Sequence, residues 1–139
     1  METRARYEAP RIGRGVLGAS VAAGPIFMTA SAVVGVLRGA NFGVIGPDDL
    51  PFVFVLLALS VPFGFVLAAI PNLLGAWALS RLGRGNDAVR LPVVWAVIGA
   101  LAAGLAIAAA DPADAESIAA FSATGAACAL LCRWGTRWE

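Results

Sequence analysis

The sequence predicts an all-α integral membrane protein, with four transmembrane helices in an antiparallel bundle. Three observations lead to this fold class. Of the 139 residues, 60% are hydrophobic and only 14% are charged, whereas a soluble domain carries about 25% charged residues. The apolar residues form four long blocks, and the Arg content of the segments between the blocks alternates from one to the next. A chain of this kind is solvated by lipid along most of its length.

Four stretches are long enough, or nearly long enough, to cross a membrane, which takes roughly 20 apolar residues. They are about residues 16–37, 51–80, 91–110 and 117–133. The first is expected to be a membrane span and not a signal peptide, because its apolar stretch is too long. Residues 1–15 are expected to form a cytoplasmic tail, and the whole chain 1–139 a single domain. The loops are short, so consecutive helices are expected to pack as antiparallel neighbours.

The second span is irregular. As a straight helix, its thirty residues would measure roughly 45 Å, well beyond a hydrocarbon core of ~30 Å. It also contains Pro62 and Pro71, and each of these removes a backbone hydrogen bond from a helix and bends it. We therefore expect a helix kinked by prolines, although one kinked helix and two broken halves both fit the sequence.

The distribution of Arg predicts the orientation, because cytoplasmic loops are enriched in basic residues. Nine of the ten Arg fall on one predicted side: Arg4, Arg6, Arg11, Arg14, Arg81, Arg84, Arg90, Arg133 and Arg137. The other side has Arg38 and most of the acidic residues. Both termini are therefore expected in the cytoplasm. The chain uses Arg and no Lys, which is typical of a GC-rich bacterial genome, so we expect a multi-pass protein of the bacterial inner (plasma) membrane.

Tryptophan supports this orientation. Trp77, Trp95 and Trp134 all fall at the predicted cytoplasmic ends of the spans. Indole rings favour the headgroup level of a bilayer. These three residues are expected to act as interface anchors.

The composition excludes many kinds of chemistry. Without His or Lys, the chain has no imidazole base and no Schiff-base lysine. Cys128 and Cys132 make half a zinc site at most, and their spacing differs from the C-x-x-C redox motif. We expect no catalytic residue, no cofactor and no metal. Because the net charge is only +1 and no dense basic run occurs, nucleic acid is not an expected partner.

Polar groups at membrane depth are few. No charged residue lies well inside any span, which counts against a proton-coupled transporter, because such proteins need an ionisable group at depth. The most polar side chain there is Asn72. It either forms a hydrogen bond across a helix interface or lines a pore beside Pro71.

Small residues recur at helical spacing. On the third span they are Ala96, Ala100, Gly104 and Ala108. Such a spacing allows close approach of two helices, either inside the bundle or at a contact with another subunit. Gly104 and Ala100 are therefore candidate packing residues.

The sequence favours a small non-enzymatic subunit, structural or accessory, that acts through helix packing. Its expected partners are the lipid bilayer and either further copies of itself in a homo-oligomer or another membrane protein in a larger complex. The alternative is a passive channel or facilitator for a small neutral or anionic solute. Such a pore would be lined by the kinked second helix, at Pro62, Pro71 and Asn72.

Overall fold

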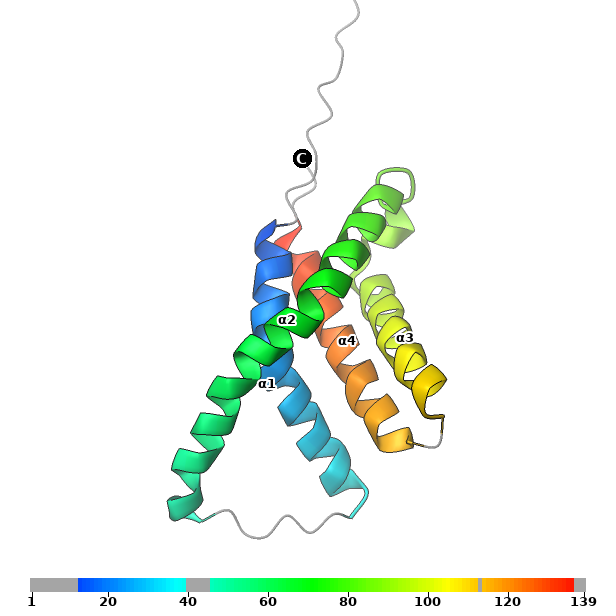
Figure 1. The fold of residues 1–139 in the computed structure, drawn as a ribbon. Coiled ribbons are helices and arrows are strands. Elements are labelled where there is room, and N and C mark those ends of the chain that lie inside the picture. Colours follow the sequence, from blue (N-terminus) through cyan, green and yellow to red (C-terminus); the bar gives the residue numbers. More distant parts are fainter. Residues whose placement is uncertain (1–12, 40–45, 113, 137–139) are drawn as a thin grey trace, which may run out of the picture.

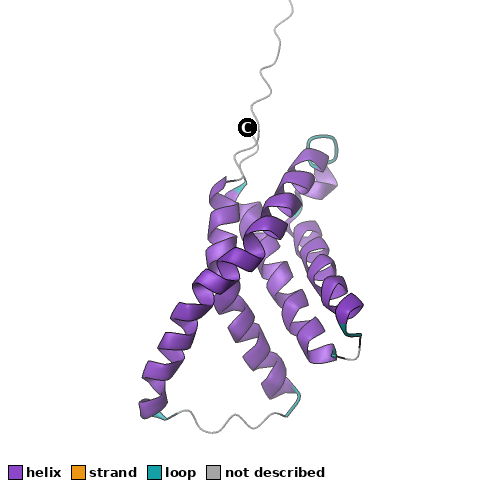
Figure 2. Cartoon of the chain, in the orientation of Figure 1, coloured by secondary structure: helices purple, strands orange, loops and turns teal. Residues whose placement is uncertain are grey.

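The computed structural model describes residues 13–39, 46–112 and 114–136. Within these ranges the chain is helical and has no strand (Figures 1 and 2). The four long helices are α1 (Gly13–Leu37), α2 (Leu50–Leu82), α3 (Pro92–Ala110) and α4 (Ala115–Gly135). All four are long and apolar enough to cross a membrane. The prediction of an all-α chain with four such helices is confirmed.

The helix ends follow local signals. A short 3-10 turn, η1 (Pro47–Asp49), leads into α2, and a second, η2 (Asp87–Arg90), precedes α3. Helix α4 begins behind Asp114, whose carboxylate accepts a hydrogen bond from the backbone N–H of Ser117 at 3.0 Å. Such a bond satisfies one of the free N–H groups at a helix start. Gly13 to Gly15 belong to α1, and the rest of the expected tail lies outside the described residues.

Helix α2 runs as one α-helix from Leu50 to Leu82. Pro62 and Pro71 both lie inside it and both are exposed. A proline ring within a helix displaces the carbonyl four residues earlier. The helix nevertheless continues through both prolines, so the two halves are not separate elements.

The most extensive contacts between helices link α2 with α1, α1 with α4, and α4 with α3. Helix α1 packs against both α2 and α4, and α3 packs against α4. In Figure 1, α2 crosses obliquely over α1 and α4 and ends near the start of α3, and it also contacts α4; α3 lies at one edge and packs mainly against α4. Two of the three expected neighbour pairs occur. The third, α2 with α3, is replaced by the pair α1 and α4.

The buried core lies toward the end of the molecule where α2 stops and α3 starts. Its members come from all four helices: Val16, Ala19, Ala23, Ala76, Leu79, Trp95, Cys128 and Cys132. Toward the other end, α2 diverges from α1 (Figure 1), and its Phe52, Phe54 and Phe63 are exposed. Exposed apolar side chains are tolerated in a bilayer, because lipid tails are as apolar as Leu.

Candidate functional site

Asn72 lies on the inner face of α2 and reaches across to α1. Its Nδ2 donates a hydrogen bond to Oγ of Ser20 at 3.3 Å. Ser20 is only 1% exposed, so its buried hydroxyl is hydrogen-bonded to the Asn72 amide and not to solvent. The bond joins two residues that lie far apart in the sequence and ties α2 to α1.

Helix α4 completes the same site. The Cys128 thiol is buried, donates to the backbone carbonyl of Ala19 with an S···O distance of 3.6 Å, and also interacts with the amide of Asn72. Ser20, Asn72 and Cys128 therefore meet where α1, α2 and α4 come together. We call these three residues the polar junction.

One turn further along α4, Cys132 repeats the contact with α1. Its thiol lies 3.8 Å from the carbonyl oxygen of Gly15, and its own carbonyl accepts a hydrogen bond from Thr136 Oγ1 at 2.8 Å. Both cysteines are buried and free. Among the described residues, no group of three or more His, Cys, Asp or Glu side chains is placed to hold a metal ion. The thiols act here as small side chains that fit between two closely spaced backbones.

Glycine makes these close approaches possible at three places. Gly24 of α1 faces Gly64 and the Ser60 carbonyl of α2, and a Cβ added at Gly24 would collide with that carbonyl. Gly15 of α1 faces Gly135 of α4 in the same way. Without a side chain at either position, two helices can bring their backbones into direct contact.

The third close approach joins α3 to α4, where Gly99 faces Gly125. A Cβ on Gly99 would collide with the Gly125 carbonyl and lie 2.6 Å from Cβ of Ala129. Gly104 is also buried against α4, and its added Cβ would collide with Oγ of Ser122. Ala100 is half-buried. The sequence singled out Gly104 and missed Gly99, although a glycine in the middle of an apolar span is itself a signal of close approach.

The structure does not bring the proposed pore residues together. Asn72 is half-buried and faces α1, whereas Pro62 and Pro71 are exposed. Nine residues separate the two prolines, so they lie on opposite sides of the helix. No single face of α2 presents all three residues.

The three tryptophans differ in their surroundings. Trp77 and Trp134 are 51% and 73% exposed, as residues at a membrane surface would be. Trp95 is 0% exposed, and its Nε1 donates to the carbonyl of Val89 at 2.8 Å. The Trp95 ring therefore lies among protein atoms, and the Val89 carbonyl in the turn η2 satisfies its indole N–H.

Comparisons with protein-family models, with curated proteins and with solved structures give no match for this chain.

Proposed function

We propose that this protein is a small non-enzymatic membrane subunit that acts through helix packing, either as a homo-oligomer or beside another membrane protein. The observation that carries the proposal is the polar junction. Asn72, the most polar side chain at depth, bonds to Ser20 and contacts Cys128. The Asn72 amide therefore interacts within the bundle and helps to hold α1, α2 and α4 together, as expected of a hydrogen bond between membrane helices.

The proposal includes a topology. The four helices cross a bacterial inner membrane as an antiparallel bundle with both termini in the cytoplasm, and α2 is tilted or bent at its prolines to fit the bilayer. The contacts between α1 and α4 support opposite directions for these two helices. Gly15 contacts Cys132, whereas Ala19, later in α1, contacts Cys128, earlier in α4. The basic ends of the described helices then lie on the cytoplasmic side, as the Arg distribution requires.

The exposed apolar side of α3 supports a role in assembly. Among the described helices, α3 packs mainly against α4, and Val97, Leu101 and Leu105 lie exposed along its outer side. A helix held on one side offers its other side to lipid or to a further helix. The same is true of the N-terminal half of α2. The channel alternative has less support, because its three lining residues do not share a face.

Co-expression of two differently tagged copies tests the proposal. Membranes would be solubilised in mild detergent, one tag captured, and the native mass of the product measured. A complex that contains both tags, or one companion protein in fixed stoichiometry, supports a packing subunit. A monomer without companions that makes reconstituted vesicles permeable to a small solute would contradict the proposal and favour the channel.

A further inference from the structure

One end of the molecule carries a strong positive charge. Among the described residues, the close contact of Gly15 with Gly135 brings the start of α1 to the end of α4. The carbonyl of Arg90, just before α3, accepts a hydrogen bond from Nε of Arg133 at 2.6 Å. Five arginines gather at this end of the described structure, with Asp87 as the one acidic residue: Arg14, Arg81, Arg84, Arg90 and Arg133.

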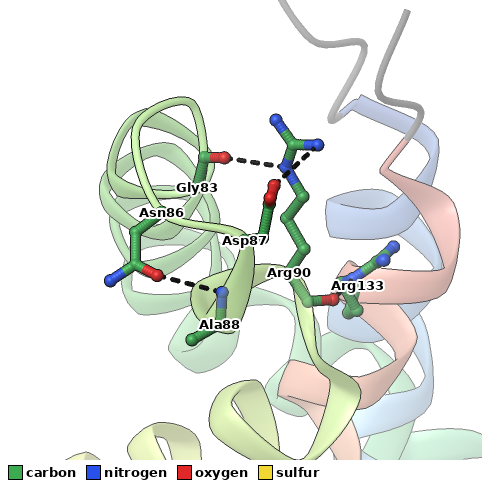
Figure 3. Close-up of polar contacts among 6 residues, drawn as sticks. All are labelled: Gly83, Asn86, Asp87, Ala88, Arg90 and Arg133. Carbon is green, nitrogen blue, oxygen red and sulfur yellow. Dashed lines mark hydrogen bonds and ion pairs between the residues drawn. The ribbon is translucent and has the colours of Figure 1, made fainter.

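Two of these arginines hold the structure of this end. Arg90 donates from Nε to the carbonyl of Gly83 at 2.8 Å and pairs through Nη1 with Oδ1 of Asp87 at 3.1 Å (Figure 3). Arg133 connects α4 to the same turn. The carboxylate of Asp87 is therefore occupied by Arg90.

Arg81 and Arg84 have a different setting. Both are exposed, and among the described residues no carboxylate pairs with either. The guanidinium of Arg81 lies over the ring of Trp77, 4.8 Å from the ring centre. This stacking holds the cation near the ring while its N–H groups stay available to an anion.

An exposed apolar stripe leads up to these two cations. Ile70, Leu74, Trp77 and Arg81 follow one another at spacings of four, three and four residues, and all are exposed. Such spacing places them on one side of α2. Arg84 follows one turn later, beyond the end of the helix. The order along this side is thus aliphatic, then aromatic, then cationic.

We propose that this side of α2, from Ile70 to Arg81, together with Arg84 just beyond the helix, binds one anionic phospholipid. An acyl chain lies along Ile70 and Leu74, the glycerol region lies at Trp77, and the phosphate lies between Arg81 and Arg84. Guanidinium groups bind phosphate through paired N–H donors. Two cations that pair with no carboxylate of the described residues favour a headgroup with net negative charge over a zwitterionic one. The arginines of this end therefore do more than set the orientation of the chain.

The test is a lipid titration of the full-length, delipidated protein in non-ionic detergent, read by native mass spectrometry. Phosphatidylglycerol is compared with phosphatidylcholine of the same acyl chains. Each Arg near an anionic membrane surface contributes roughly a fivefold change in affinity. Arg84→Gln should therefore weaken phosphatidylglycerol binding about fivefold, and Arg81→Gln with Arg84→Gln about 25-fold. Binding of phosphatidylcholine should stay unchanged in both variants.

Arg38→Gln is the matched control, because Arg38 is an exposed arginine at the opposite end. It should leave phosphatidylglycerol binding unchanged, and circular dichroism in the same detergent should show that all variants stay folded. Equal losses in Arg38→Gln and Arg84→Gln would overturn the proposal, because they would reflect total charge alone. Displacement of the lipid by inorganic phosphate at equal concentration would also overturn it, since the acyl chain would then contribute nothing.

Discussion

Replacement of Gly99 by Ala tests whether glycine contacts hold the helices together. The added Cβ would lie 2.6 Å from Cβ of Ala129 and collide with the carbonyl of Gly125. Two carbon atoms prefer a separation of about 3.5–4.0 Å, so α3 and α4 must separate by roughly 1 Å at this point. The Gly125 carbonyl is part of the α4 backbone, and the Ala129 Cβ is attached directly to it. Neither group can rotate away from the added Cβ.

The size of the effect follows from two opposing terms. Overpacking of a close contact costs about 1–3 kcal/mol, whereas Ala in place of Gly improves helix propensity by at most about 1 kcal/mol. The net loss for Gly99→Ala should therefore be roughly 1–2 kcal/mol. Gly75→Ala in α2 is the matched control, since a Cβ there meets nothing within 4 Å. It should be neutral or slightly stabilising.

The assay is unfolding in mixed detergent micelles, followed by circular dichroism while the fraction of denaturing detergent is raised. Gly99→Ala should unfold at a lower fraction than the native protein, and Gly75→Ala should not. If both variants unfold together with the native protein, the close approach of α3 and α4 does not stabilise the fold, and the argument from glycine contacts fails.

Three further predictions concern other parts of the chain. Gly104→Leu should destabilise by roughly 1–3 kcal/mol because Gly104 is buried against α4; the exposed Leu105→Ala should be milder, and equal unfolding curves would contradict this. Cysteine tags at Asp87 should react only from the cytoplasm and tags at Asp114 only from outside; labelling of both from one side would refute the four-span topology. Hydrogen bonds from Ser117 lower the pKa of Asp114 below its ordinary value of 3.8, so its ionised form favours folding. The loss of stability in Asp114→Ala relative to the native protein should thus be constant near neutral pH and shrink as the pH falls below 3.8. Thermal unfolding of both proteins in detergent from pH 7 to 3 measures this loss. A loss that grows as the pH falls would contradict the prediction.

Apolar length predicted the helices well, because crossing a membrane demands a long run without charges. Helix α1 (Gly13–Leu37) and α3 (Pro92–Ala110) lie close to the expected stretches 16–37 and 91–110. Length and apolarity do not depend on which helix lies next to which. The positions of the helices along the sequence can therefore be predicted without knowledge of any contact between them.

Contacts between helices were harder to predict, for a physical reason. In an Ala-rich chain, small residues recur at spacings of four on several faces, so the ladder through Ala100 and Gly104 marks no unique surface. Gly99 contacts Gly125 because the backbones of α3 and α4 come close together at this point. The spacing of small residues alone does not predict where that point lies. Trp95 shows the same limit, because a Trp at a helix end suits both a membrane surface and a buried position. Its burial depends on where the turn η2 places the Val89 carbonyl.

The polar junction adds to the packing something that the glycines alone do not supply. The backbones of α1 and α2 come closest at Gly24 and Gly64, and apolar contacts beyond this point specify no individual partner. The bond from Asn72 to Ser20 adds a second point, about one turn away along α1 and about two turns away along α2. Two points fix both the crossing angle and the rotation of α2. Apolar packing in lipid is only weakly directional, whereas a hydrogen bond at depth has a definite partner and geometry. Asn72 therefore has a structural reason to lie where it does.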